Sequence, residues 1–318
     1  MKNNTVILAL GLCASLVTSG AFAETRITYK SAKTGSSYYQ MGVQLAEAMK
    51  AGTNGDIIVT VEESQGSVQN VMEAKARGGD YVFTTPPALV GLAQGGKAMF
   101  EGKGDPKFDN IRALFPIPSL TMHFVMSADS GVTDFAGMEG KTILLGKGSF
   151  GATEGEKYLN LFGLEGKVNL AEVELSNAVP ALKNGQIDGF VTAGSWPAPN
   201  VIEAAASADV VVLSLSDEQI AGTKRSKLVI PAGTYAGQTA DIATTSLPVA
   251  AFTTTAMSDD AAYELTRTFW ESKTAMAEDA PWWKGVDKSL MANITSKLHP
   301  GAVRYYTEAG FELTADQQ

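Results

Sequence analysis

The chain is poor in the side chains that covalent and metal-dependent catalysis need. Among 318 residues there are one cysteine, Cys13, and two histidines, His123 and His299. Cys13 lies in a leader-like N-terminus, so the remainder has no thiol for a disulfide, a nucleophile or a metal site. His-x-x-x-His pairs, cysteine clusters and Asp-x-Asp loops, the common metal-binding patterns, are missing. The sequence therefore predicts no metal and no cofactor.

Positive charge and long apolar runs are also scarce. Lys and Arg number 25 against 34 Asp and Glu, which gives a formal net charge of −9. Such a charge disfavours binding to nucleic acid and to anionic lipid surfaces. After residue 23 no segment approaches 18 uninterrupted apolar residues, so direct membrane insertion is not expected.

The first 23 residues have the pattern of a Sec-type signal peptide. Lys2 precedes a short apolar stretch at 6–17, and Ala21-Phe22-Ala23 has the small-x-small form of a cleavage site. Leu12 stands where a lipoprotein signal would have a small residue before its cysteine. An uncleaved membrane anchor is the alternative, but the apolar stretch is short for it. We predict cleavage after Ala23 and a periplasmic protein.

The rest of the chain alternates strand and helix patterns, which predicts an α/β fold. At 45% hydrophobic and 19% charged residues it has the composition of a folded globular protein. In the first helix Tyr38, Met41, Leu45 and Met49 share one face. Strands are predicted at 26–30, 57–61, 81–84, 142–145, 173–175, 187–192 and 210–215, and helices at 38–50, 67–77, 86–94, 151–162, 178–184, 197–206, 259–276, 285–297 and 301–309.

Two extended apolar runs interrupt this alternation, at 114–129 and at 247–255. They indicate two crossings between a discontinuous first lobe and an inserted second lobe. We predict lobe I at 24–122 and 250–318 and lobe II at 123–249.

Glycine and hydroxyl residues gather at five junctions between a strand and a helix: 34–37, 65–67, 84–86, 148–151 and 193–197. In open α/β sheets ligands bind beyond the carboxyl ends of strands, where helix N-termini present unpaired N–H groups that favour anions. Helix capping alone explains any single junction. Five together favour a ligand held between the lobes.

These junctions provide the candidate ligand-binding residues. Backbone N–H groups at Gly35, Ser36, Ser149, Phe150 and Ser195 would bind an anionic head, and the hydroxyls of Ser37, Ser67, Thr84 and Thr85 would orient it. The full set is Gly35, Ser36, Ser37, Tyr38, Gly66, Ser67, Thr84, Thr85, Ser149, Phe150, Gly151, Ala193, Gly194, Ser195 and Tyr235. Contacts from Lys33, Lys147 or His123 are left open.

Other classes of protein fit less well. The segment 146–151 matches G-x-G-x-x-G, but it lies in mid-chain and has no acid or base paired with it. A periplasmic serine hydrolase would need His123 or His299 beside a cleft serine, and no Gly-x-Ser-x-Gly elbow is present. An adhesive surface protein lacks support because no anchor or repeat is visible. We predict no catalytic residues.

In the order of its motifs the chain resembles the TAXI-type solute receptors of TRAP (tripartite ATP-independent periplasmic) transporters. The matching segments are 34–39, 66–70, 140–146, 185–190, 233–235 and 299–306. The resemblance implies a type II-like, two-lobed periplasmic binding protein with a ligand cleft and two hinge strands. It also implies a small organic anion, similar to glutamate or 2-oxoglutarate, that is delivered to TRAP permease subunits in the membrane.

Two segments depart from this family's pattern. The first junction is shorter in glycine than the usual Gly-Gly-x-x-Gly-Thr run, and Pro86 and Pro87 follow Thr84-Thr85 where relatives often carry a glutamine and an acid. Each proline removes a backbone donor. The identity of the solute, the coupling ion and the oligomeric state stay open.

Overall fold

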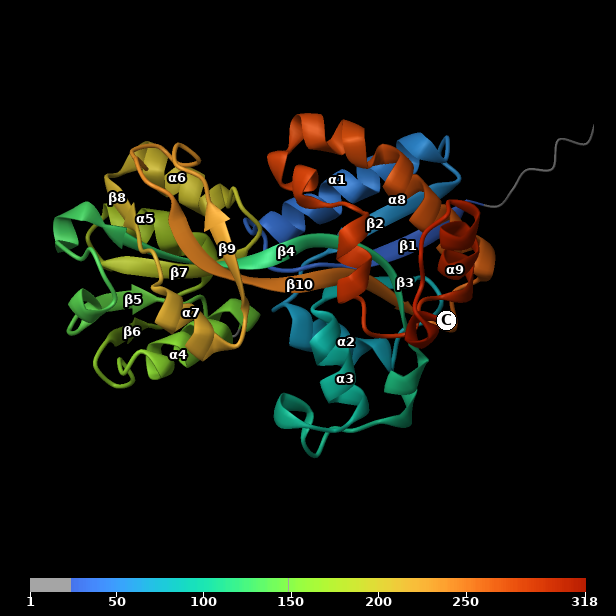
Figure 1. The fold of residues 1–318 in the computed structure, drawn as a ribbon, viewed down its shortest axis with the longest axis horizontal. Helices are drawn as coiled ribbons and strands as arrows, with labels where there is room; N and C mark the ends of the chain where they lie inside the picture. Colours follow the sequence, from blue (N-terminus) through green and yellow to red (C-terminus); the bar gives the residue numbers. More distant parts are fainter. Residues whose placement is uncertain (1–23, 148) are drawn as a thin grey trace, which may run out of the picture.

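Two lobes joined by two long strands form the molecule (Figure 1). The computed structural model describes residues 24–147 and 149–318, so the predicted signal peptide at 1–23 lies outside the described residues. The connecting strands are β4 (Ile111–Ser127) and β10 (Ile242–Thr254). They correspond to the two extended runs seen in the sequence, and the α/β, two-lobed architecture is confirmed.

One ten-stranded sheet passes through both lobes in the order β2-β1-β3-β10-β4-β7-β5-β6, with β8 paired to β4 and β9 to β10. Its other strands are β1 (Thr25–Lys30), β2 (Ile57–Glu62), β3 (Tyr81–Thr85), β5 (Thr142–Leu144), β6 (Asn169–Ala171), β7 (Gly189–Gly194), β8 (Val210–Val212) and β9 (Ser226–Ile230). The strands β1 to β3 are mutually parallel, as are β5 to β7, whereas β10 and β4 run antiparallel to their neighbours.

The helices divide between the lobes. Lobe I has α1 (Ser37–Gly52), α2 (Ser67–Ala74), α3 (Pro87–Gln94), α8 (Asp259–Asp279) and α9 (Pro300–Glu308), and lobe II has α4 (Phe150–Leu161), α5 (Ala178–Lys183), α6 (Pro199–Ser207) and α7 (Asp217–Thr223). In lobe I, α1 with α8 and α2 with α3 lie on opposite sides of the strands (Figure 1). Right-handed connections from β1 to β2 and back to β3 require this arrangement.

The crossing strands change partners between the lobes. In β4, Thr121 pairs both with Ser246 of β10 and with Gly194 of β7. In β10, residues 250–252 pair with β3, whereas residues 242–246 pair with β9. A register shift between Leu247 and Val249 interrupts the ladder between these two regions. The division of the chain at 122/123 and 249/250 stays a prediction.

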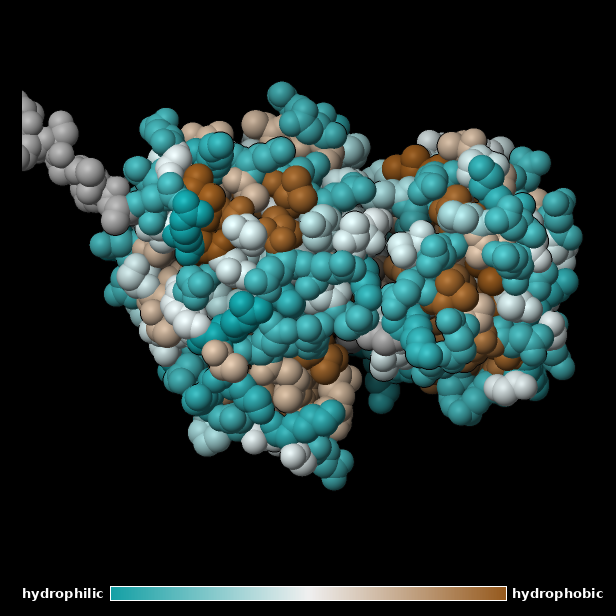
Figure 2. All heavy atoms as spheres, turned by 180° about the vertical axis from the view of Figure 1, so that it is seen from behind, coloured by the Kyte–Doolittle hydropathy of each residue, from teal (hydrophilic) through white to brown (hydrophobic). Residues whose placement is uncertain are grey.

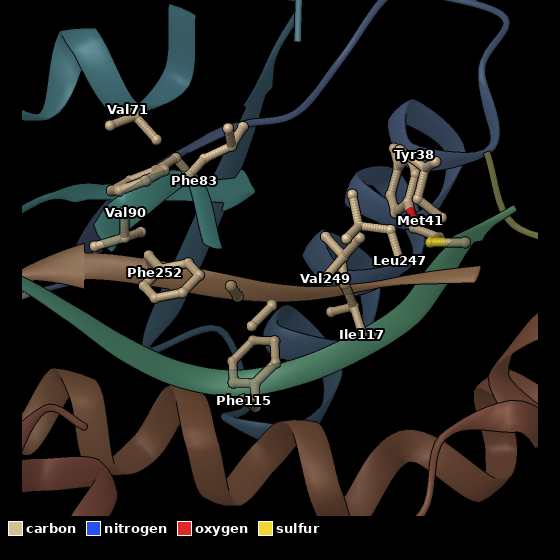
Figure 3. Packing of buried hydrophobic residues seen from close by; sticks show 14 of the residues in the cluster. Tyr38, Met41, Val71, Phe83, Val90, Phe115, Ile117, Leu247, Val249 and Phe252 are labelled. Atoms are coloured by element: carbon tan, nitrogen blue, oxygen red, sulfur yellow. The ribbon is translucent and has the colours of Figure 1, made fainter. Parts of the chain in front are cut away.

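The hydrophobic core of lobe I extends along these strands (Figure 3). Phe83 of β3 stacks on Phe252 of β10, and Phe115 of β4 stacks on Phe269 of α8, with ring centroids 5.9 and 4.1 Å apart. Nearer to lobe II, Val249 is buried beside the start of α1 (Figure 3). The start of α1 and the crossing strands are therefore parts of one packed unit.

Two sequence predictions were wrong. The predicted strand at 173–175 is instead β6 at 169–171, an edge strand whose exposed side chains give no hydrophobic pattern. The predicted helix at 285–297 is a pair of 3₁₀ turns, Pro281–Gly285 and Lys288–Asn293. The sequence at 285–297 has a helix-like apolar periodicity because side chains such as Met291 and Ile294 are buried, although the segment that carries them is irregular. The sequence analysis also missed α7 and β9.

Candidate functional site

A cavity lies where the two lobes meet, beside the crossing strands. It contains about 580 Å³ of empty space, including the part open to solvent. Figure 2 shows how the surface narrows between the lobes. The lining residues are Ser31, Ala32, Lys33, Ser36, Tyr38, Gln65, Gly66, Ser67, Thr84, Leu120, Leu145, Ser149, Gly151, Leu175, Val191, Ala193 and Val249.

The walls of this cavity differ in chemistry. Lobe I contributes most of the polar side chains, from the loop before α1, the start of α2 and the end of β3. Lobe II and the crossing strands contribute a mainly apolar wall that includes Leu145, Val191 and Val249. A ligand in the cavity would therefore have a polar and an apolar side.

Three helices begin at the cavity, namely α1, α2 and α4. Ser36 and Ser149 cap α1 and α4, since their Oγ atoms accept from Tyr39 N at 3.3 Å and from Ala152 N at 3.0 Å. Gly66 precedes α2 with φ +110°, a backbone conformation that favours glycine, and provides no side-chain cap. Unpaired N–H groups and partial positive charge concentrate at helix N-termini. The part of the cavity next to these three helix starts therefore favours an anion.

Lys33 connects the lobes across the cavity. Its Nζ lies 3.0 Å from Oε2 of Glu174, which follows β6 in lobe II. Lys33 is the one charged side chain among the described residues that line the cavity. Lys147, the other lysine left open by the sequence, instead pairs with exposed Glu172 and lies outside the lining.

A second direct contact closes the lobes. The backbone N–H of Ser195 in lobe II donates to Oγ of Ser37 in α1 at 2.9 Å. Gly194 permits this approach, because a Cβ at that position would lie 2.6 Å from the same oxygen. The contact needs a residue without a side chain at position 194.

The structure brings together eight of the fifteen predicted ligand-binding residues in the cavity lining: Ser36, Tyr38, Gly66, Ser67, Thr84, Ser149, Gly151 and Ala193. Gly35, Ser37, Thr85, Gly194, Ser195 and Tyr235 lie outside the lining, and the side chain of Phe150 is not described. Three predicted backbone donors have other partners, since Ser36 N donates to Lys33 O, Ser149 N to Gly146 O and Ser195 N to Ser37 Oγ. The sequence analysis missed the apolar wall, which has no motif.

Tyr235 and His123 form a buried pair inside lobe II. The Tyr235 hydroxyl accepts from Ala198 N at 3.0 Å and lies 2.8 Å from His123 Nε2. Burial lowers the pKa of His123 to about 4, so its imidazole is neutral at pH 7 and can accept a hydrogen bond from the Tyr235 hydroxyl. The pair is a packing feature of lobe II, with His123 on the crossing strand β4.

This pair predicts a loss of stability in acid. The unfolded chain binds a proton at His123 below its ordinary pKa of 6.5, whereas the folded protein resists protonation until about pH 4. Stability from His123 is therefore complete above pH 6.5 and falls as pH decreases, by about 2 kcal/mol between pH 7 and pH 5. Urea unfolding of the wild type and of His123→Gln at both pH values measures this difference. An equal pH dependence in both proteins would contradict it.

No described serine has a histidine partner. The buried Oγ of Ser195 has no hydrogen-bond partner within the described ranges, and His123 Nε2 bonds to tyrosine. His299 caps α9 by accepting from Gly301 N at 3.2 Å. A serine hydrolase needs its nucleophile and base within hydrogen-bonding reach, and this geometry does not provide that pair.

Comparison with known proteins identifies the fold and the family. The periplasmic binding protein BugD aligns with a TM-score of 0.56 at 10% identity over 90% of this chain and 98% of that one. A solved structure from Bordetella bronchiseptica RB50 aligns with a TM-score of 0.52 at 15% identity over 92% and 84%. The fold is that of the two-lobed periplasmic solute-binding proteins. The model of the NMT1-like family matches residues 30–310, and the chain belongs to that family. Along 24–147 and 149–318 we find no helix with the length and apolar character of a membrane span.

Proposed function

We propose that the protein is a periplasmic solute receptor that captures a small organic anion between its lobes and delivers it to a membrane permease. The observation that carries the proposal is the cavity at the lobe junction, on which three helix N-termini and Lys33 converge. Each lobe contributes to the lining, so a bound solute would add contacts that favour the closed arrangement. The role is transport, without a chemical step.

We further propose that the permease is of the TRAP type and that the receptor belongs to the TAXI group. The support is the ordered set of sequence motifs, which spans the chain from 34–39 to 299–306. The wider group of two-lobed receptors also serves ABC transporters. The assignment to a TRAP permease and to the TAXI group therefore rests on the sequence motifs alone. The resemblance to the TAXI group implies an anion similar to glutamate or 2-oxoglutarate.

Native mass spectrometry of the protein recovered from periplasm tests the receptor function. We expect a chain that begins at Glu24 and carries one organic acid, which is released and identified on denaturation. Protein stripped of this acid should gain thermal stability when the acid is returned, and small-angle scattering should show equal or smaller dimensions. A stripped protein that responds to no organic acid in a broad panel, by either measurement, would refute the proposal.

A further inference from the structure

We infer that the solute is a monocarboxylate with an uncharged, apolar body, whose carboxylate faces lobe I and whose body lies against lobe II and the crossing strands. The inference rests on the proposed function and narrows it to a class of ligand. It departs from the dicarboxylates that the resemblance to the TAXI group implies.

Lobe I provides the groups that would bind the carboxylate of the ligand. Lys33 lines the cavity and provides its one charged side chain within the described lining. Ser67, in the first turn of α2, is 9% exposed, and its hydroxyl has no hydrogen-bond partner among residues 24–147 and 149–318. The hydroxyl of a buried residue that lines a cavity and has no protein partner is available to donate to a ligand oxygen. Lys33, which also pairs with Glu174, and the free hydroxyl of Ser67 at a helix N-terminus suit a single carboxylate.

Other hydroxyls on this side are already engaged. Ser31 Oγ donates to Tyr38 O at 2.6 Å, Ser36 Oγ to Lys33 O at 2.7 Å and Thr84 Oγ1 to the Tyr29 hydroxyl at 2.7 Å. The single hydroxyl proton of each of these side chains is already used in a hydrogen bond within the protein. The polar wall therefore offers fewer donors than its composition suggests.

Most of the opposite wall offers no partner to a second charge, and its polar part is the start of α4, where Ser149 lines the cavity. Leu120, Leu145, Val191 and Val249 are buried, with at most 6% of each exposed, and Leu175 completes the surface. Glu174, which directly precedes Leu175 in the chain, is negative and would repel a second carboxylate. An anion placed against these apolar side chains loses its hydration without gaining a partner. An apolar body gains from the same burial.

Two 2-oxo acids of similar size test this assignment, because they share a head and differ in the tail. We expect 4-methyl-2-oxopentanoate to bind the stripped wild type at least ~30-fold more tightly than 2-oxoglutarate, by calorimetry, since an unpartnered charge costs about 2 kcal/mol or more. The uncharged 4-methyl-2-pentanone should bind far more weakly than the acid. Binding of 2-oxoglutarate equal to or tighter than that of the apolar acid overturns the inference and leaves the receptor function intact. If neither acid nor any other organic anion binds, both fail together.

A pair of arginine variants tests where the tail lies. Leu175→Arg places a cation on the apolar wall and should reduce the preference for the apolar acid at least ~10-fold. Leu170→Arg makes the same change at an exposed leucine of β6, outside the cavity, and should preserve the preference. Equal selectivity in folded Leu175→Arg and in Leu170→Arg would place the tail elsewhere and overturn the proposed orientation.

Discussion

Replacing Lys33 with glutamate is expected to weaken binding of the anionic ligand by at least ~100-fold. A charge-assisted hydrogen bond is worth about 1.5–3 kcal/mol, and the replacement adds repulsion between the new carboxylate and the ligand. It also places two acids at the lobe junction, because Glu174 lies 3.0 Å from the present lysine nitrogen. Closure of the lobes and affinity for the anion should therefore both decrease. Calorimetry with the acid recovered from the native protein measures the loss.

Lys157→Glu is the matched control for this prediction. Lys157 is an exposed residue of α4 outside the cavity lining, and its replacement changes the net charge by the same amount. We expect wild-type affinity from it. Equal losses in the two variants would mean that Lys33 acts only through the overall field of the protein. A folded Lys33→Glu protein with wild-type affinity would place the anion away from Lys33.

The strand-to-helix junctions could be predicted from sequence because their chemistry is local. Glycine and hydroxyl residues beside an apolar periodic stretch mark helix starts, and parallel strands bring such starts to one edge of a sheet. That reasoning found Ser36, Gly66 and Ser149, which lie at the starts of three separate helices around one cavity. It did not distinguish hydroxyls available to a ligand from hydroxyls used for capping, because the two uses share a sequence pattern.

The remaining parts of the site depend on contacts between distant residues. The Lys33–Glu174 pair joins two loops in different lobes, and neither residue lies in a motif. Within the apolar wall, Leu120, Val191 and Val249 lie in strands and Leu145 directly follows one, and no sequence motif marks them. Tyr235 lies among small residues, as a ligand-contacting aromatic would, yet its hydroxyl is held by Ala198 and His123 inside lobe II. Only the tertiary structure distinguishes residues that line the cavity from residues that pack inside a lobe.

The second prediction of a large effect concerns the tryptophan pair near the C-terminus. The structure buries both Trp282 and Trp283. The two indole nitrogens donate to the same oxygen, Gln44 Oε1 of α1, at 3.2 and 2.7 Å. The Trp283 ring also meets Phe269 edge-on at 6.1 Å. This cluster attaches the C-terminal segment to the helix that begins at the cavity.

Trp283→Ala is therefore expected to lower the free energy of unfolding by about 3–5 kcal/mol, the usual cost of removing a fully buried large aromatic side chain. Denaturant unfolding at neutral pH measures the change. Trp283→Phe keeps an aromatic ring in the site and should lose about half as much or less, although Gln44 loses one donor. Because Trp283 lies outside the cavity lining, the folded fraction of either variant should bind the ligand with wild-type affinity. Wild-type stability of Trp283→Ala would contradict the packing, whereas an affinity loss in the folded protein would mean that α1 transmits this contact to its N-terminus at the cavity.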